Sequence, residues 1–234
     1  WNISDTGWAK AAYSSYFGPW NQGTTLFVHH TAVFDPVKSL QLLSTHPVTT
    51  MCGAPTIYRM LVQQDLTQYK FPHLRHCVGA GEPLNPEVIE TWKRATDIVI
   101  RDGYGQTETV LVCGNFPFLE PRFGSMGKPM PGIDMAIIDN DGQTVAANEE
   151  GDIAIRVKPN RAPGLFTEYR GDKERFDACF VGDWYITGDR GYIDDDGYFW
   201  FVSRADDVIL SAGYRIGPFE VESALIEHAA VVES

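Results

Sequence analysis

Short β-rich runs alternate with helical patterns over the first half of the chain, and this alternation most constrains the fold. The expected strands are residues 24–30, 48–51, 74–78 and 98–100, and the expected helices are residues 35–44, 54–64 and 85–94. Two helices begin at typical starting residues, Asp35-Pro36 and Asn85-Pro86, where an acceptor side chain caps the helix and a proline fits its first turn. This order is typical of a parallel sheet covered by helices. We therefore predict an α/β subdomain over residues 1–123.

The pattern changes after Phe123. A connection rich in Gly and Pro, residues 124–132, leads to expected strands at 135–138, 152–157, 192–193 and 198–202. Asp-Gly turns between such strands are typical of hairpins, so we predict a smaller antiparallel, β-barrel-like subdomain over residues 124–204. The Asp194-Asp195-Asp196 run lacks the alternating ligands and the distal Glu of a Ca²⁺ loop, so we interpret it as a hairpin turn. An amphipathic helix is expected from Pro218.

Composition and charge narrow the classes of partner. The 234 residues are 44% apolar and 21% charged, as in an ordinary globular protein with a sizeable core. The net charge of −12 argues against a nucleic-acid or anionic-membrane partner, but leaves room for an anionic small molecule at a local site. No apolar run approaches the length of a membrane span. The four cysteines lack CxxC spacing and are expected to be free thiols in a reducing compartment.

The two ends suggest a larger protein. The chain begins at Trp1 without a methionine, and it ends in the apolar run Val231-Val232, which looks like an element just beginning. We therefore expect this chain to be an internal fragment.

The stretch from Asp102 to Thr109 gathers groups that suit a nucleotide. It follows the strand expected at 98–100, and its glycines allow a sharp turn and a close approach to a ligand. An aromatic ring can stack on a base, a hydroxyl and backbone N–H groups can hold a phosphate, and a carboxylate can take Mg²⁺. Open α/β sheets bind ligands at such strand ends. A ligand loop and a plain strand-to-loop turn both fit this pattern alone.

Other candidate residues also have two interpretations. Asp189, in a Gly turn just past a β-like segment, can accept hydrogen bonds from a ribose diol or can cap the turn. Arg204 can add a polar contact there or form a surface salt bridge. The aromatic residues of 1–23 fit either a buried helix or the wall of an apolar pocket. The sequence contains no GxxxxGK[ST] and no GxGxxG motif.

Four ordered stretches together resemble the core motifs of the adenylate-forming superfamily, which includes acyl-CoA synthetases, luciferases and the adenylation domains of peptide synthetases. They are Tyr104-Gly105-Gln106-Thr107-Glu108, Thr187-Gly188-Asp189, Arg204-Ala205-Asp206-Asp207-Val208-Ile209 and the stretch from Ser211 to Glu222. Finer features resemble the medium-chain acyl-CoA synthetases of the mitochondrial matrix, among them Ser4-Asp5-Thr6-Gly7-Trp8, Ala54-Pro55-Thr56-Ile57-Tyr58-Arg59-Met60 and Pro159-Asn160-Arg161. The resemblance spans the whole chain.

The resemblance implies a two-step reaction on a medium-chain fatty acid or another apolar carboxylic acid. The acid attacks the α-phosphate of ATP to give acyl-AMP, and the thiol of coenzyme A then displaces AMP. Thr107 and Glu108 would be the catalytic residues, with Thr107 at the α-phosphate and Glu108 on Mg²⁺. The implied ATP- and AMP-binding residues are Gly81, Glu82, Pro83, Asp102, Gly103, Tyr104, Gly105, Gln106, Thr107, Asp189, Arg204 and Arg215.

Further roles follow from the same resemblance. Ala212, Gly213 and Tyr214 would lie beside coenzyme A. The acyl pocket would be lined by Trp8, Gly79, Ala80 and the segment after Glu108. Asp206 would be the hinge of a C-terminal lid, of which residues 205–234 are the start.

Two parts of the family's machinery have no counterpart in this sequence. The family's phosphate loop lies upstream of the region matching Trp1, and its lid lysine lies beyond Ser234. We therefore expect this chain alone to make no acyl-adenylate. The alternatives are a substrate such as acetate or benzoate, and a truncated, catalytically silent homologue that binds nucleotide or a partner.

Overall fold

The computed structural model divides into two compact units, Trp1–Gly103 and Tyr104–Ser234, which are described separately. It describes residues 1–205, 207, 209–211, 214–226, 228 and 231. The division into parts 1–123, 124–204 and 205–234 stays a prediction.

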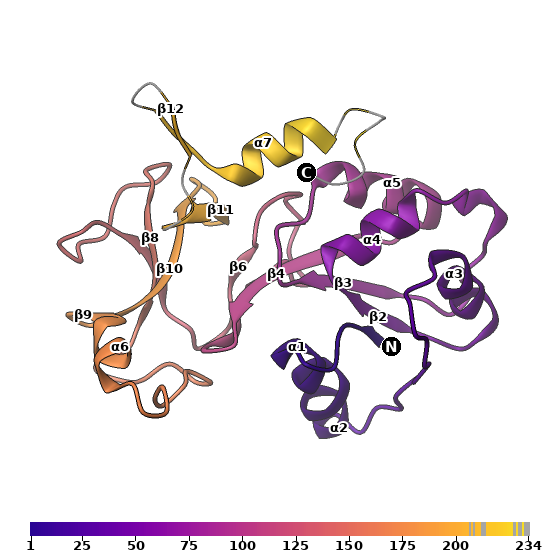
Figure 1. Ribbon diagram of the computed structural model, residues 1–234, viewed down its shortest axis with the longest axis horizontal. Helices are drawn as coiled ribbons and strands as arrows, with labels where there is room; N and C mark the ends of the chain where they lie inside the picture. Colours follow the sequence, from indigo (N-terminus) through magenta and orange to yellow (C-terminus); the bar gives the residue numbers. More distant parts are fainter. Residues whose placement is uncertain (206, 208, 212–213, 227, 229–230, 232–234) are drawn as a thin grey trace. The chain divides into compact units, whose positions relative to one another are not determined.

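A parallel sheet forms the centre of the first unit (Figure 1). Its strands, in spatial order, are β1 (Asn2–Ile3), β2 (Thr50–Gly53), β3 (His76–Ala80) and β4 (Ile100–Gln106). The helical elements are α1 (Ala9–Ala12), a π-helical stretch (Tyr13–Phe17), α2 (Gly18–Asn21), α3 (Pro36–Thr45), α4 (Pro55–Val62), a 3₁₀ turn (Leu66–Gln68) and α5 (Pro86–Thr96). The predicted parallel sheet with covering helices is confirmed.

Side chains from several elements hold the first unit together. Asp35 and Asn85 cap α3 and α5, each accepting a hydrogen bond from a backbone N–H of the first turn. The buried Tyr58 of α4 donates its hydroxyl to the carbonyl oxygens of Met51 at 3.3 Å and Val78 at 3.0 Å, so α4 is tied to β2 and β3. Its ring meets that of Trp92 of α5 edge-on, with the ring centroids 6.0 Å apart.

The second unit is mainly antiparallel. The end of β4 is followed in its sheet by β5 (Val110–Gly114) and β6 (Lys128–Pro129), and β5 and β6 are antiparallel. A second sheet has the order β11 (Phe199–Arg204), β10 (Trp184–Ile193), β8 (Gly151–Arg156), β7 (Met135–Ile138), and β9 (Phe180–Val181) also pairs with β10. The remaining elements are α6 (Lys173–Ala178), the hairpin β12 (Ile209–Ser211) with β13 (Tyr214–Ile216), and α7 (Pro218–Ile226). The predicted antiparallel part is confirmed.

Three local expectations are corrected. Residues 24–30 form no strand, because Val28 is 83% exposed and the segment has no continuous buried face to hold it in a sheet. The strand expected at 98–100 runs instead as β4 through both glycines to Gln106. Asp189 lies within β10, where the strand register shifts between Ile186 and Arg190, and not beyond the strand.

Gly105 of β4 allows a close approach between two backbone segments. A Cβ built on Gly105 would lie 1.8 Å from the carbonyl oxygen of Val110, at the start of β5. The chain turns after Gly105, where the backbone N–H of Gln106 donates to Thr109 Oγ1 at 2.9 Å and Thr109 donates back to the Gln106 carbonyl at 3.2 Å. Glycine at 105 therefore lets the two strands pair.

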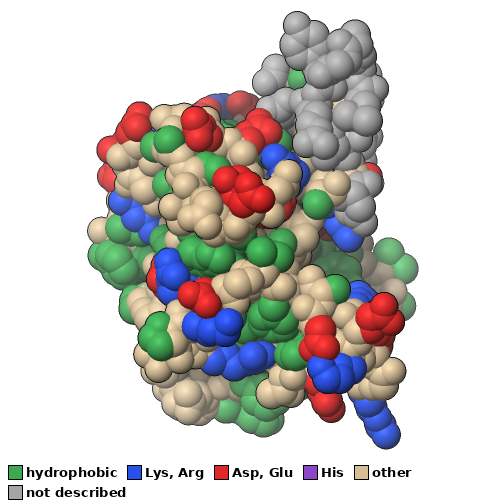
Figure 2. All heavy atoms as spheres, turned by 90° about the vertical axis from the view of Figure 1, so that its left-hand side faces the viewer, with side chains coloured by type: hydrophobic (Ala, Val, Ile, Leu, Met, Phe, Trp, Pro, Cys, Tyr) green, Lys and Arg blue, Asp and Glu red, His purple; other side chains and the backbone are tan. Residues whose placement is uncertain are grey.

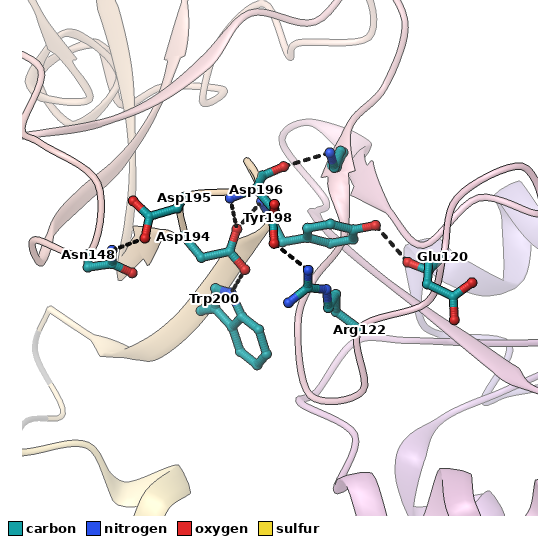
Figure 3. Close-up of polar contacts among 9 residues, drawn as sticks. Glu120, Arg122, Asn148, Asp194, Asp195, Asp196, Tyr198 and Trp200 are labelled. Atoms are coloured by element: carbon teal, nitrogen blue, oxygen red, sulfur yellow. Dashed lines mark hydrogen bonds and ion pairs between the residues drawn. The ribbon is translucent and has the colours of Figure 1, made fainter.

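The acidic run between β10 and β11 is a hairpin turn, as predicted (Figure 3). Asp194 accepts hydrogen bonds from the backbone N–H groups of Asp196 and Tyr198 and from Trp200 Nε1. Burial raises the pKa of Asp194, but these hydrogen bonds outweigh it and hold the pKa below its usual value. Asp196 pairs with Arg122. Asp194 therefore stabilises the hairpin, and Asp196 ties the hairpin to Arg122.

The structure also bears on the cysteines, on membrane-spanning helices and on the surface charge. All four cysteines lie in the described part of the chain and form no disulfide. Among the described residues, no helix is long and apolar enough to cross a membrane. Figure 2 shows acidic and basic side chains mixed over the face that it presents.

Candidate nucleotide-binding site

Asp189 is the centre of a hydrogen-bonded cluster in the second unit. It lies on β10 and is only 9% exposed. Tyr104 donates its hydroxyl to Asp189 Oδ2 at 2.5 Å, and Gln106 Nε2 donates to the same oxygen at 2.8 Å. Both donors come from the end of β4. A buried carboxylate is costly unless it is hydrogen-bonded, and these donors meet that requirement.

The side-chain amide of Gln106 holds several residues of this cluster in place. Its Nε2 also donates to the carbonyl oxygen of Thr187 at 2.8 Å, and its Oε1 accepts from the hydroxyl of Tyr185 at 3.2 Å. Both ends of the amide are therefore used inside the protein. Sequence reasoning missed Tyr185, although residues 185, 187 and 189 have the period-two spacing of one strand face.

Tyr104 is a neutral hydrogen-bond donor. Burial, followed by the nearby Asp189 carboxylate, raises the pKa of Tyr104 well above its usual value. The phenol therefore stays protonated at neutral pH and donates a hydrogen bond to Asp189. Its ring packs against the apolar cluster that includes Val112, Ile153 and Tyr185.

Thr107 and Glu108 lie in the turn between β4 and β5, where Thr107 is exposed and Glu108 is half-buried. Tyr169 donates its hydroxyl to Glu108 Oε1 at 2.8 Å. Among the described residues there is no group of three or more His, Cys, Asp or Glu that could hold a metal ion. Mg²⁺ commonly takes one or two carboxylates and completes its shell with phosphate oxygens and water, so a single carboxylate fits a cation that accompanies a nucleotide.

Arg204 is the cross-strand partner of Asp189 in the β10–β11 pair. The backbone N–H of Ala205 donates to the Gly188 carbonyl at 2.9 Å, which extends the pairing by one residue. The structure thus brings Tyr104 and Gln106 to Asp189 within β10, next to Arg204 at the end of β11.

The expected residues of the first unit gather at the carboxyl ends of β3 and β4. Gly79 pairs with Asp102, and Ala80 pairs with Gly103. Gly81 has a φ of 112°, which favours glycine, and it precedes Glu82 and Pro83. The Glu82 carboxylate accepts a hydrogen bond from Thr56 and pairs with Arg59 Nη2 at 3.6 Å. The expected acyl-pocket residue Trp8 is 51% exposed.

Asp102 is a buried acid of this unit, and Lys10 is a half-buried base. Burial raises the pKa of Asp102 to about 7, although Oδ1 accepts a hydrogen bond from the N–H of Gly103 at 3.0 Å. Lys10 Nζ donates to the Ala80 carbonyl at 2.8 Å, and burial lowers the pKa of Lys10. Sequence reasoning missed Lys10, because one lysine in an aromatic segment carries no local signal.

The expected residues near the end of the chain are only partly described. Asp206, Ala212 and Gly213 lie outside the described residues. Tyr214 and Arg215 lie on β13, but their side chains are outside the description.

Comparison with known proteins assigns the chain to a family. The family model described as AMP-binding enzyme matches residues 1–167, and the chain belongs to that family. Over 234 residues, the chain is 58% identical to both the rat and the human proteins named acyl-coenzyme A synthetase ACSM3, mitochondrial. It spans 40% of the length of these relatives.

Solved structures of related enzymes have the same fold. The anthranilate CoA ligase AuaEII, in complex with anthranoyl-AMP, has a TM-score of 0.83 and is 34% identical, over 92% of this chain and 41% of its own. ATP-bound MatB from Rhodopseudomonas palustris has a TM-score of 0.76 and is 30% identical, over 86% of this chain and 39% of its own.

Proposed function

We propose that the full-length protein containing this chain is an AMP-forming acid–thiol ligase. A carboxylic acid reacts with ATP to give acyl-AMP and pyrophosphate, and coenzyme A then gives acyl-CoA and AMP. The observation that carries the proposal is the braced Asp189 carboxylate, which Tyr104 and Gln106 hold next to Arg204 on the neighbouring strand. The names of the relatives, acyl-coenzyme A synthetases, support the reaction class.

In this proposal Asp189 and Arg204 bind the ribose. The carboxylate accepts hydrogen bonds from the ribose hydroxyls, as acidic residues do in dinucleotide sites. Gln106 acts through Asp189 and orients it, because both ends of its amide are already bonded within the protein. Gly81, Glu82, Pro83 and Tyr104 would bind the adenine. Asp102, Gly103 and Gly105 are further proposed nucleotide-binding residues.

Thr107 and Glu108 serve the reacting phosphate. Exposed Thr107 contacts the α-phosphate, and the Glu108 carboxylate holds the Mg²⁺ that accompanies ATP. When bound, that cation neutralises the charge that builds on the phosphate and pyrophosphate. The residues of the chain then act mainly by positioning the reacting groups and by stabilising the charge that develops on the phosphate.

The remaining roles stay proposals of the same account. Trp8, Gly79 and Ala80 line the acyl pocket, and we propose a medium-chain fatty acid as the substrate. We propose further that Arg215 binds the nucleotide, that Ala212, Gly213 and Tyr214 bind coenzyme A, and that Asp206 acts as the lid hinge. A mitochondrial matrix location is in keeping with the names of the relatives.

Pyrophosphate exchange into ATP tests the proposal in the full-length protein. The acid panel is octanoate, acetate and benzoate, with anthranilate added because AuaEII binds anthranoyl-AMP. We expect Mg²⁺-dependent exchange that is fastest with octanoate and at least about tenfold slower in Asp189→Asn, which removes the charge of the ribose acceptor. Asp195→Asn is the matched control, because Asp195 lies in the hairpin turn and its side chain accepts from Asn148.

The outcomes separate the candidate functions. Pyrophosphate exchange with octanoate would support the proposed ligase. Faster exchange with acetate or benzoate would show that the substrate is not a medium-chain fatty acid. Binding of ATP without exchange for any acid would contradict the ligase and favour a silent nucleotide-binding homologue. The 234-residue chain is assayed beside the full-length protein, and we expect no acyl-adenylate from it.

A further inference from the structure

A tyrosine distant in sequence holds the Glu108 side chain. Tyr169 donates its hydroxyl to Glu108 Oε1 at 2.8 Å, from a position 61 residues further along the chain. The same segment also holds the backbone, because the N–H of Phe166 donates to the carbonyl oxygen of Glu108 at 2.7 Å. Glu108, in the turn before β5, is therefore held at both its backbone and its side chain by the segment between β8 and α6.

Neighbouring rings and a cation hold Tyr169 in place. The ring centroids of Phe166 and Tyr169 are 4.7 Å apart, and Phe166 also packs against Tyr185 at 5.8 Å. The guanidinium carbon of Arg175, on α6, lies 4.4 Å from the centroid of the Tyr169 ring. Such contacts restrict the ring before any ligand arrives, so the hydroxyl is already directed at Glu108.

The hydrogen bond has a defined polarity. A phenol has an ordinary pKa of about 10 and keeps its proton at neutral pH, so the Tyr169 hydroxyl is the donor. The Glu108 carboxylate therefore accepts. Within the part of the chain that the structure describes, its other oxygen, Oε2, has no hydrogen-bond or ion-pair partner.

We propose that Tyr169 is a positioning residue: it fixes the Glu108 carboxylate through Oε1 so that Oε2 is presented to the Mg²⁺ that enters with ATP. The inference rests on the proposed function. Groups that bond to metal-binding side chains orient them, and their loss typically weakens metal binding about 10–100-fold. Without the hydroxyl, Glu108 in its half-exposed turn would sample several rotamers, and ordering it on the cation would cost free energy.

Metal affinity, measured apart from turnover, tests this role. Mn²⁺, which accepts the same oxygen ligands, is titrated into the full-length protein with α,β-methylene-ATP and followed by electron paramagnetic resonance. We expect Tyr169→Phe to weaken Mn²⁺ binding about tenfold or more. Binding of AMP without metal is expected to be unchanged. Tyr198→Phe is the matched control, because it deletes a hydroxyl that donates to the Glu120 carbonyl at 2.6 Å in the same unit.

A double-mutant cycle links the effect to Glu108. Tyr169→Phe should have no further effect on Mn²⁺ binding in Glu108→Gln, where the carboxylate is already lost. Equal Mn²⁺ affinity in wild type and Tyr169→Phe overturns the proposal, as does an equal loss of metal-free AMP binding, which would indicate a general structural role. If Tyr169→Phe does not fold, Glu108→Asp, whose shorter side chain draws the carboxylate away from the tyrosine, must weaken Mn²⁺ binding. Unchanged affinity in Glu108→Asp overturns the proposal.

The same titration separates this inference from the proposed function. If the wild-type protein shows no nucleotide-dependent Mn²⁺ binding, the ligase proposal fails together with the inference. If it binds Mn²⁺ with the nucleotide and Tyr169→Phe binds equally well, the positioning role alone fails.

Discussion

Deleting the hydroxyl of Tyr104 tests how Asp189 is held. In Tyr104→Phe the ring stays, but Asp189 Oδ2 loses the donor that lies 2.5 Å away and keeps Gln106 Nε2 at 2.8 Å. A hydrogen bond to a charged group contributes about 1.5–3 kcal/mol. Because Asp189 is only 9% exposed, water replaces the lost donor poorly. At about 1.4 kcal/mol per tenfold, this loss predicts AMP binding about 10–100-fold weaker if the carboxylate must be held to bind ribose.

Calorimetric titration of the full-length protein with AMP, 2′-deoxy-AMP and 3′-deoxy-AMP measures this effect. The wild-type protein should prefer AMP, and the preference should shrink in Tyr104→Phe because the weakened contact is the one to the ribose hydroxyls. Tyr198→Phe, a hydroxyl deletion in the same unit, should retain the wild-type preference. A Tyr104→Phe protein that discriminates among the three nucleotides as wild type does would refute the reasoning.

Three further substitutions test the fold of each unit. The raised pKa of Asp102 means that its stabilising contribution is fully present below its unfolded pKa of about 4 and is lost as the pH rises through about 7. In the wild-type protein the free energy of unfolding should therefore fall by up to about 4 kcal/mol between pH 4 and 8, since the pKa differs by about three units. Urea unfolding of Asp102→Asn should not show this fall. An unchanged pH profile in the variant would contradict the burial argument. Asp194→Ala, which removes three hydrogen bonds of the hairpin, should destabilise the protein by about 1–3 kcal/mol, whereas Asp195→Ala should be nearly neutral; equal midpoints in thermal unfolding would disprove this difference. Gly105→Ala should prevent stable folding, because the new Cβ would meet the Val110 carbonyl oxygen, and a soluble variant with wild-type circular dichroism would contradict that contact.

Local chemistry made much of the fold predictable. The helices α3 and α5 begin where the sequence predicted, because Asp35 and Asn85 supply the acceptors that their first turns require. The hairpin between β10 and β11 is predictable from the Asp196-Gly197 turn between two β-rich runs. The structure adds that Asp194 accepts hydrogen bonds from the turn backbone and from Trp200.

The remaining features depend on contacts between distant residues. Residues 24–30 have strand propensity but lack a buried face, so propensity alone did not decide their structure. The extension of β4 through Gly105 depends on the backbone of β5, which no local pattern reveals.

The sequence indicates the motif residues of the candidate site, but it does not indicate the distant residues that hydrogen-bond to them. The residues Gln106, Glu108 and Asp189 stand out in the sequence because they belong to short glycine-containing motifs. Tyr169 and Tyr185, which bond to Glu108 and Gln106, are 61 and 79 residues away from them in sequence. Only the folded second unit brings these tyrosines to the motif.

The position of the ribose tests the central claim most directly. A crystal structure of the full-length protein with a non-hydrolysable acyl-AMP analogue measures the distances from the ribose hydroxyls to the Asp189 carboxylate. We expect at least one O–H···O hydrogen bond of about 2.5–3.0 Å to Asp189, with Tyr104 and Gln106 still bonded to that carboxylate. An analogue bound with its ribose away from Asp189 would contradict the account.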